Sequence, residues 1–306
     1  MLTELEKEVL NQIVDVHKIP QGAFNIRRDG EGIERESSEE IQIIPKKDKS
    51  GIDILIKPGI KNRSVHIPVI VTKSGIKDVV YNTFRVGEDS DVLIVAGCAI
   101  HNPGEEESSH DGIHEFIVEK NARMKYTEKH YAQGKGKGKK ILNPTTIVEA
   151  FENSVVEMEM IQIKGVDNTK RDTKVILHEG AKLIITERLF TDYDQKAESN
   201  ITIELVGENS SAQIISRSVA RGTSEQIYHF DMIGKNKCAG HIQCDAIIMD
   251  KAKVTSLPAI SAEHEDAALI HEAAIGKIAS EQLVKLMSLG LSEKEAEDTI
   301  LDGFLR

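Results

Sequence analysis

HEGAKLIITE (residues 178–187) is followed by ENSSAQIISR (residues 208–217), and the two stretches share one pattern. Each opens with a polar turn, passes a small residue, and continues with the alternation of apolar and polar residues that is typical of a strand. The same pattern recurs in EKNARMKYTE (119–128), FENSVVEMEM (151–160), GKNKCAGHIQ (234–243), MDKAKVTSLP (249–258) and EDAALIHEAA (265–274). The small residues are Ala122, Ser154, Ala181, Ala212, Cys238, Ala252 and Ala267. Most of their separations are one or two multiples of about 14 to 16 residues.

A repeat of this length predicts stacked turns of a solenoid rather than hairpins. In a solenoid each turn changes direction at a corner where only a small side chain fits, and then adds a strand to a sheet. A meander of hairpins would need tight Asn-Gly or Asp-Gly turns between paired strands. We interpret Asp29-Gly30, Asp111-Gly112 and Asp302-Gly303 as lying outside paired strands. The sequence therefore predicts a mainly β fold, a parallel β-helix, with a β-sandwich as the alternative.

The chain before the repeat is also rich in strand patterns. Residues 29–49 are charged and Ser-rich, and we expect a loop there with a short strand at 41–44. Short β-branched runs that end in Gly or in a polar residue then follow one another. These runs are IDILIKPG (52–59), HIPVIVTKSG (66–75), VVYNTFRVG (79–87) and DVLIVAGCAI (91–100). The segment YAQGKGKGKK (131–140) interrupts the pattern, and because it does not match GxxxxGK[ST], we interpret it as a solvated loop between turns rather than a phosphate-binding loop.

Helical patterns occur at both ends of the chain. Residues 1–18 predict an amphipathic helix in which Thr3 and Glu6 form a capping box and which Pro20 ends. Its apolar positions are Leu2, Leu5, Val9, Ile13 and Val16.

The C-terminal tail predicts two further helices, at about 280–289 and 292–304. Ser280 is expected to cap the first helix, and Gly290 suits the left-handed position that ends it. Ser292 and Glu295 have capping-box spacing at the start of the second helix. We therefore divide the chain into an N-terminal helix (1–20), a β-helix core (21–275) and a C-terminal helical segment (276–306).

Composition excludes several classes of protein. The chain has 306 residues, 39 Lys and Arg against 50 Asp and Glu, and a formal net charge of −11, so it has no net cationic field to attract nucleic acid. No apolar run approaches the roughly 20 residues that span a bilayer, and the polar N-terminus is not a signal peptide. Three cysteines argue against a disulfide framework. We expect a cytoplasmic protein that binds neither nucleic acid nor membrane.

The cysteines are the first candidates for chemistry. Cys238 and Cys244 would share one face of a strand, about 20 Å apart, and His241 would point to the other face. One metal ion therefore does not join them in a straight strand. Each cysteine, including Cys98, could equally be a small buried apolar residue.

Histidines form the second group of candidates. His101, His110 and His114 follow Cys98 in a segment that we expect to be an exposed loop, and they are secondary candidates for metal binding. His271 and Glu272 lie among apolar or small residues, so we expect partial burial, either as a structural pair or as a functional one. There is no nucleophile elbow, HExxH, CxxC or GxGxxG motif, and we expect no enzyme activity in the chain itself.

Several of these motifs together resemble one family. GCAIH (97–101), QCDAIIMD (243–250), HEAAIGKIASEQLVKLMSLGLSEKEA (271–296) and the closing GF (303–304) resemble the SufB/SufD iron–sulfur cluster assembly scaffolds, over roughly Val92 to the end. The resemblance implies a right-handed parallel β-helix with flanking helices. It also implies a SufC-type ABC ATPase partner that docks on the C-terminal helices and hydrolyses the ATP. The expected cargo is a transient iron–sulfur cluster, 4Fe–4S in type, that is passed to recipient apo-proteins.

The resemblance extends to single residues. Cys244 falls on the QCD cysteine of SufB, His271 and Glu272 fall on its HEA motif, and Cys98 falls on its GC segment. These four are the candidate cluster residues. We expect stacking to bring the HEA pair near Cys244 two strands later, with Glu272 rather than His271 facing the cluster, and Cys98 could instead receive or relay sulfur. The candidate ATPase-binding residues are Leu283, Leu286, Met287, Ile300 and Phe304.

The chain is shorter than a bacterial SufB and carries the QCD cysteine that SufD chains lack. It therefore resembles a short SufB-like form that works as a homodimer with the ATPase. Two alternatives stay open: a structural subunit that organises the ATPase dimer, and a carbohydrate-active β-helix protein. The absence of Trp and the presence of only five Tyr weigh against the second alternative, because sugar sites often use exposed aromatic platforms.

Overall fold

The computed structural model describes residues 3–14 and 22–306, of which about 60% form strands and 10% form helices. The first half of the chain contains α1 (Glu4–Val14), β1 (Ala23–Arg28), β2 (Glu31–Glu36), β3 (Ile41–Pro45), β4 (Gly51–Ile56), β5 (Arg63–Val71), β6 (Lys77–Val86), β7 (Asp91–His101), β8 (Ser108–Val118), β9 (Arg123–Gln133), β10 (Lys140–Leu142) and β11 (Thr145–Ala150). The second half contains β12 (Val155–Lys164), β13 (Asn168–Leu177), β14 (Lys182–Thr191), β15 (Lys196–Leu205), β16 (Ser210–Ala220), β17 (Glu225–Gly234), β18 (Cys238–Ile248), β19 (Lys253–Ala262), β20 (Ala267–Gly276), α2 (Ser280–Ser288) and α3 (Glu293–Leu305).

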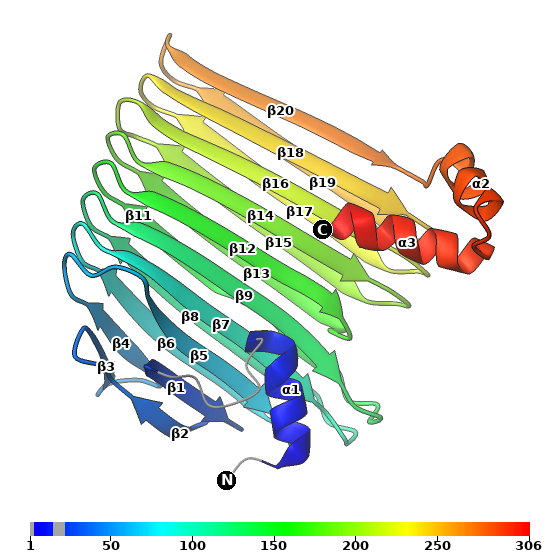
Figure 1. The fold of residues 1–306 in the computed structure, drawn as a ribbon, viewed down its shortest axis with the longest axis horizontal. Coiled ribbons are helices and arrows are strands. Elements are labelled where there is room, and N and C mark those ends of the chain that lie inside the picture. The colour runs from blue at the N-terminus through cyan, green and yellow to red at the C-terminus, as the bar shows by residue number, and fades with distance from the viewer. Residues whose placement is uncertain (1–2, 15–21) are drawn as a thin grey trace.

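Successive strands alternate between two sheets that face each other, which makes a β-solenoid of about eight turns (Figure 1). Sheet A has the order β2-β1-β5-β7-β9-β12-β14-β16-β18-β20. Sheet B has the order β19-β17-β15-β13-β10-β8-β6-β4-β3, with β11 between β13 and β8. From β5 to β20 every described strand pair is parallel, so the predicted parallel β-helix is confirmed and the β-sandwich alternative is wrong.

Small residues fill one corner of each turn, as the repeat predicts. Asn121 and Asn153 adopt left-handed backbone conformations, and the buried Ala122 and Ser154 follow them. The Ser154 hydroxyl donates to the Phe151 carbonyl at 2.7 Å, so the small residue also satisfies a turn carbonyl. Asn is suited to this corner because its short polar side chain tolerates positive φ.

Two positions of the predicted repeat need correction. Ala212 lies inside β16, and Ser210, which follows the left-handed Asn209, fills the corner instead. Ala252 follows the left-handed Asp250 at the opposite end of the strands. The predicted repeat did not distinguish the corners at the two ends of the strands, because at both ends a polar residue in the left-handed conformation comes before a strand.

The space between the sheets is the core. Inward side chains alternate with outward ones along each strand, and β15 shows the pattern without interruption. Aliphatic residues dominate the core, and Phe84 and Phe116 stack with ring centroids 4.5 Å apart. The strands therefore hold inward side chains at fixed positions along the solenoid axis.

The first turn is closed by antiparallel strands. β1 pairs with β2 and β3 pairs with β4, both antiparallel. Asp29 and Gly30, at φ 49° and 87°, join paired strands in a tight hairpin. The interpretation of Asp29-Gly30 as lying outside paired strands is therefore wrong. The expected short strand at 41–44 is confirmed as β3, but the charged segment around it also forms β2.

Helix α1 covers the outer face of sheet A near this end. The predicted capping box is present, with the Thr3 amide donating to Glu6 at 2.6 Å. Val9 and Ile13 are buried, and a Cβ on Gly97 would come within 2.7 Å of Ile13, so glycine permits the close approach. The predicted positions Leu2, Val16 and Pro20 lie outside the described residues.

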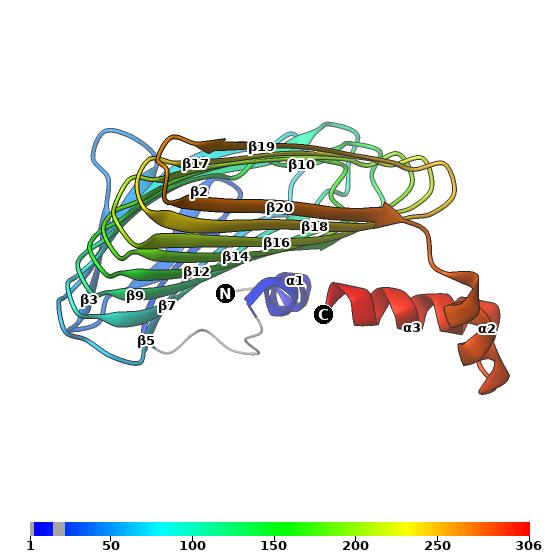
Figure 2. The ribbon, with the colours of Figure 1, turned by 90° about the horizontal axis from the view of Figure 1, so that it is seen from above.

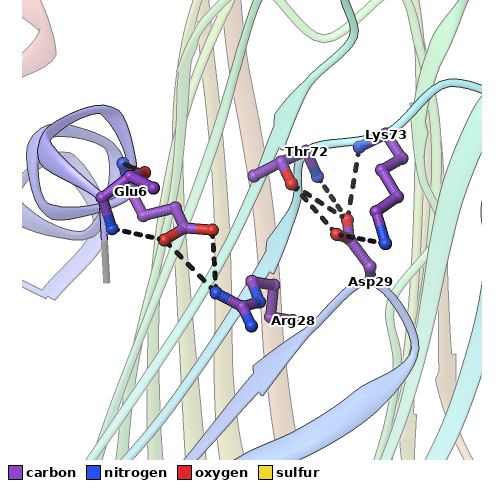
Figure 3. A network of polar contacts seen from close by, with 6 residues as sticks. Glu6, Arg28, Asp29, Thr72 and Lys73 are labelled. Carbon is purple, nitrogen blue, oxygen red and sulfur yellow. Dashed lines mark hydrogen bonds and ion pairs between the residues drawn. The ribbon is translucent and has the colours of Figure 1, made fainter. Parts of the chain in front are cut away.

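Two polar contacts hold this region together (Figure 3). Arg28 of β1 donates to Glu6 of α1 at 3.2 Å, and Asp29 accepts from the amide of Thr72 at 2.6 Å and from that of Lys73 at 3.3 Å. The first contact joins helix to sheet, and the second joins the hairpin turn to the end of β5. The N-terminal segment is thus fixed to the first turns of the solenoid.

The C-terminal helices follow β20. Ser280 is the first residue of α2 and makes no capping hydrogen bond, so its predicted capping role is wrong. The capping box of Ser292 and Glu295 and the left-handed Gly290 are both confirmed. Helix α3 folds back against the outer face of sheet A, on the same side as α1 (Figure 2). Leu301 is buried in this contact, and Arg188 donates to the Arg306 carbonyl at 2.8 Å.

The Gly/Lys segment continues the stacking. β9 reaches Gln133, and the following loop lies on the loop after β7, with the amides of Gly136 and Gly138 donating to the carbonyls of Asn102 and Gly104. Lys135, Lys137 and Lys139 are exposed. No helix in the described parts of the chain is long and apolar enough to cross a membrane.

Candidate functional site

Cys244 lies on β18 and points into the solenoid. Its register neighbours in sheet A are Ser216 on β16 and Ala273 on β20. Only 5% of the residue is exposed, and burial raises the pKa of the thiol to about 12. The thiol therefore needs a partner that favours its negative form before it can act as a ligand or nucleophile.

His271 lies on β20, two strands after Cys244 in the sequence and beside it in the sheet. Its register partner is Ile242, which is buried on the inner face of β18. His271 therefore shares the inner face with Cys244, about 8 Å away between Cα atoms from the standard strand spacing and rise. Its Nε2 is buried without a hydrogen-bond partner, and burial lowers the pKa of the imidazole. A neutral imidazole nitrogen with no partner is free to act as a ligand.

Glu272 points to the outer face. It pairs in register with Gln243, and its Oε1 lies 3.0 Å from Nε2 of His241. Within one copy of the chain, the pleat thus puts His271, and not the favoured Glu272, on the face of Cys244. The expectation that only one of the two neighbours shares that face is confirmed.

Cys98 lies far from Cys244. It is buried on β7, and its register line runs through His130, Gln162, Leu189 and Ser218 to Ala246 on β18. Five strand spacings of about 4.8 Å separate the two cysteines by about 24 Å. Burial raises the pKa of Cys98 well above its usual value, and the carboxylates of Glu128 and Asp78 add to the effect. The two thiols therefore cannot bind one cluster within a single copy.

The expected exposed loop with His110 and His114 is wrong. Both residues lie on β8 and are buried, at 2% and 3% exposure. Their Cα atoms lie about 13 Å apart along the strand, but both Nε2 atoms turn towards Gly112 between them, each within 3.4 Å of where a Cβ on that glycine would lie. His110 Nδ1 lies 3.0 Å from Asp78 Oδ2, and His114 Nδ1 lies 2.8 Å from the Tyr126 hydroxyl. His101, at the end of β7, has a buried Nδ1 without a partner.

A buried run of polar side chains crosses the middle of the solenoid. Tyr126 donates to Glu128 at 3.0 Å, Glu128 is paired with Arg171, and Arg171 Nε lies 3.8 Å from Glu187. Ser216 then donates to Glu187 at 2.9 Å, which brings the run to the register neighbour of Cys244. Burial acts to raise the pKa of Glu128, but Arg171, His130 and His114 together outweigh it and hold that pKa well below the usual value.

The sequence reasoning missed this run, although it carries a visible signal. Glu128, Arg171 and Glu187 each occupy an inward position of an alternating strand, where an apolar residue is expected. Charged residues at such positions are rarely buried unless they are paired. Strand parity alone could therefore have identified them.

The side chains around Cys244 do not form a metal site within one copy. Across residues 3–14 and 22–306, no three His, Cys, Asp or Glu side chains are grouped so that they could hold a metal ion. The last turn of the solenoid is also open, since Ile260 and Ile275 point inward yet are 44% and 41% exposed. A metal ion bound at Cys244 would therefore need further ligands from outside this copy.

The tail exposes most of its apolar residues. Helix α2 has no buried residue; Leu283 and Leu286 are half-buried, and Met287 is 43% exposed. Ile300 and Phe304 of α3 are half-buried. The sequence reasoning did not select Val284 and Leu289, which are the most exposed apolar residues of this segment.

Comparison with known proteins identifies relatives that match most of the chain. Residues 71–304 match the family model described as SUF system FeS cluster assembly, SufBD core domain. An iron–sulfur cluster assembly SufBD family protein of Archaeoglobus fulgidus is 30% identical over 278 residues, which cover 89% of this chain and 73% of that protein. One from Methanocaldococcus jannaschii is 29% identical over 82% of this chain and 79% of its own length.

A longer relative from Staphylococcus aureus, also named an iron–sulfur cluster assembly SufBD family protein, is 29% identical over 73% of this chain but only 50% of its own length. The match with the family model spans most of the solenoid and both C-terminal helices. It therefore includes the inner face that carries Cys98, Cys244 and His271. The chain belongs to the SufBD family of iron–sulfur cluster assembly proteins.

Proposed function

We propose that this chain is the scaffold on which a nascent iron–sulfur cluster is built and from which it is passed to recipient apo-proteins. The chain itself is not the enzyme, and ATP hydrolysis belongs to a partner ABC-type ATPase. The observation that carries the proposal is the inner face of the last turns, where Cys244 and the unpartnered imidazole of His271 lie side by side at an open solenoid end. Its three cysteines, all free, suit a reducing, cytoplasmic setting.

The donor set suits temporary binding of the cargo. Iron–sulfur clusters are held by thiolates, and imidazole can replace a thiolate at some iron atoms. One thiol and one imidazole per copy leave positions of a 4Fe–4S cluster unfilled by this chain. A cluster held by so few ligands is released more easily than one held by four thiolates, as a scaffold requires.

A second copy is the partner that we propose for the open end. β19 and β20 are edge strands with unpaired backbone groups, and solenoids need such ends covered. A homodimer formed there would cover the exposed apolar residues and bring two copies of Cys244 and His271 towards one interface. Glu272, which faces outward in one copy, is available to that interface as well.

The proposed ATPase site is the helical tail. Leu283, Leu286 and Met287 of α2, with Ile300 and Phe304 of α3, leave apolar surface uncovered beside the solenoid. Deleting residues after Gly276 should leave a folded solenoid that no longer retains the ATPase in a pull-down. Retention by the truncated chain would contradict this docking site.

Anaerobic reconstitution with iron and sulfide tests the scaffold role. The wild-type protein should develop the visible absorption of an iron–sulfur cluster, and Cys244→Ser should abolish it. His271→Ala should lose more absorption than Glu272→Ala, because His271 shares the inner face with the thiol. Cys238→Ala is the matched control, since Cys238 is a buried corner cysteine on the same strand.

Two results would contradict the proposal. Full absorption in Cys244→Ser would move the site to Cys98, and no absorption in the wild-type protein, with or without the ATPase, would favour the structural-subunit alternative. For Cys98 we propose that it receives or relays sulfur, so Cys98→Ser should slow reconstitution from a protein sulfur donor more than reconstitution from free sulfide.

A further inference from the structure

Two buried histidines of β8 turn their ring nitrogens towards one point inside the solenoid. A Cβ on Gly112 would lie 3.3 Å from Nε2 of His114 and 3.4 Å from Nε2 of His110. Apart from the chain neighbours of Gly112, the atoms nearest to that point belong to these two rings. Gly112 is buried on the inner face of the strand, so the two imidazoles face each other where alternation would place an apolar side chain.

The contacts of His114 fix which of its nitrogens carries the hydrogen. Asn82 accepts from the Ile52 amide through Oδ1 at 3.2 Å, so its Nδ2 is the donor that lies 3.3 Å from Nε2 of His114. On the other side of the ring, Nδ1 lies 2.8 Å from the Tyr126 hydroxyl, which donates its own hydrogen to Glu128. Nδ1 therefore donates, and Nε2 carries the lone pair.

His110 is held in the same form by a carboxylate. Its Nδ1 lies 3.0 Å from Oδ2 of Asp78. Burial acts to raise the pKa of Asp78, but hydrogen bonds from His110 and Arg27 outweigh it and hold that pKa below its usual value. The carboxylate accepts from Nδ1, and Nε2 of the neutral ring is buried with no hydrogen-bond partner among the described residues. Histidines that bind metal ions commonly donate their other N–H to a carboxylate in this way.

A further polar group lies beside His114. Thr146 of β11 is its register partner on the inner face, about 4.8 Å away between Cα atoms. The Thr146 hydroxyl is buried and has no partner in the part of the chain that the structure describes. Two buried polar atoms without partners, on Thr146 and on His110, thus lie close to Gly112.

The charge between the sheets also suits a cation. Within residues 3–14 and 22–306, the buried carboxylates between the sheets are Asp78, Glu128 and Glu187, and the buried guanidinium groups there are Arg27 and Arg171. One carboxylate is in excess when all five groups are ionised. Buried charges are costly unless they are paired, so a cation in this region would reduce the imbalance.

We propose that the space over Gly112 is a binding site for a divalent transition-metal ion such as Zn²⁺, held by Nε2 of His110 and Nε2 of His114. Imidazole is a good ligand for zinc, copper, iron and nickel. Two side chains are fewer ligands than the four of a closed structural zinc site, so water completes the coordination, and the Thr146 hydroxyl can bond to that water. This ion is separate from the cargo proposed for Cys244.

The test uses Zn²⁺ alone, added while the denatured full-length chain refolds, because both histidines are enclosed. Cys98→Ala, Cys238→Ala and Cys244→Ala together remove the thiols, so that no sulfur binds the probe. Mass spectrometry of the metal after gel filtration counts the zinc retained, and the Nε2 resonances of ¹⁵N-labelled histidines show which rings bind it. One tightly held ion per chain should shift the resonances of His110 and His114 and raise the unfolding midpoint.

Gly112→Ala is the sharpest variant, because it keeps both histidines and places a methyl group between their Nε2 atoms. It should abolish the retention of zinc and the rise in the unfolding midpoint. Gly32→Ala is its control, since a Cβ there has no atom within 4 Å. His114→Gln should also abolish retention. His130→Gln should not, because His130 is as deeply buried but its Nδ1 lies 3.3 Å from Gln162.

Three results would overturn the inference. They are a thiol-free parent chain that retains no zinc, equal retention in Gly112→Ala and the parent, and equal losses in His130→Gln and His114→Gln. Circular dichroism without zinc shows whether each variant has refolded, and if Gly112→Ala has not, the comparison of the two histidine variants decides. Since no thiol is present, failure of this site leaves the role of Cys244 untouched.

Discussion

The two ends of the solenoid are finished in different ways. At the first turn the chain closes itself: β1 pairs with β2, β3 pairs with β4, and α1 lies over the outer face. At the last turn β19 and β20 end the sheets with inward-facing side chains such as Ile260 exposed. Figure 1 shows the N-terminal hairpins at one end and the single uncovered strands at the other.

The edge strands themselves differ in composition. β2 reads EGIERE, and its charged residues discourage another strand from pairing with it. β19 and β20 read KVTSLPAISA and AALIHEAAIG, which are largely apolar and carry little charge. The difference holds for sheet A, whose edge is charged at the closed end and apolar at the open end; β3, the sheet B edge at the closed end, reads IQIIP and carries no charge.

The thiols follow the same division. Cys98 lies in the earlier half on β7, between β5 and β9 of the same sheet, and Cys244 lies one strand from the open edge. Buried charge is also concentrated away from the open edge, in Arg27, Asp78, Glu128 and Arg171. Buried ion pairs thus lie towards the closed end, whereas Cys244, although about as buried as Cys98, lies one strand from an uncovered edge.

The largest expected effect is a loss of stability when a buried ion pair at the closed end is broken. Arg27 of β1 donates to Asp78 of β6 at 2.8 Å, and this buried pair joins the hairpin to the facing sheet. Asp78→Asn leaves the guanidinium without a counter-charge and should cost about 3–5 kcal/mol in the free energy of unfolding. Denaturant unfolding followed by circular dichroism measures it.

The open end supplies the control for this variant. Glu272→Gln breaks the exposed pair with His241 and should cost less than about 1 kcal/mol. Equal losses in the two variants would show that the buried pair at the closed end stabilises the fold no more than the exposed pair at the open end.

The second expected effect is a loss of stability at low pH, caused by a buried histidine in the closed half. Burial lowers the pKa of His114 to about 4, below the value of about 6.5 in an unfolded chain. A depressed pKa means that the unfolded chain binds the proton first, so the stabilisation is complete above pH 6.5 and is lost as the pH falls towards 4. The shift corresponds to about 3 kcal/mol.

His114→Gln should flatten this pH dependence. Glutamine is uncharged and can still bond to the neighbouring Asn82 or Tyr126, which contact the His114 nitrogens at 3.3 and 2.8 Å. Unfolding midpoints measured between pH 7.5 and pH 4 should fall less in the variant than in the wild type. The half-buried His271 at the open end should contribute less, so His271→Gln should change the profile less than His114→Gln.

The sequence predicted the repeating architecture because corners and strands leave local signals. A small residue after a polar left-handed position, as at Ala122 and Ser154, needs only short-range geometry. The strands on either side of these corners were predicted because their alternating apolar and polar residues are also a local signal. The hairpin at Asp29-Gly30 was missed because its strands are charged, and a charged edge strand lacks the alternation by which strands are recognised.

The site was only partly predictable. Cys244 and His271 were identified by resemblance, but which side of the sheet His271 faces depends on strand register, which a single residue of slip reverses. The burial of His110 and His114 was missed because glycines and serines suggested a loop, whereas Tyr126 and Asp78 supply their partners from other strands. Such partners are set by stacking, which the local sequence does not encode.

The smallest expected effect is on dimerisation, and it tests whether a second copy covers the open end. Ile260 of β19 and Ile44 of β3 are similarly exposed, at 44% and 42%, and lie at opposite ends of sheet B. If two copies meet at the open end, Ile260→Lys places a charge in the interface and should weaken dimerisation at least about tenfold, because burying an unpaired ammonium group is costly. Ile44→Lys should leave dimerisation unchanged. Light scattering and sedimentation across a concentration series measure both variants. Equal weakening by the two lysines, or a wild-type chain that stays monomeric with and without the ATPase, would mean that the open end is covered by something other than a second copy.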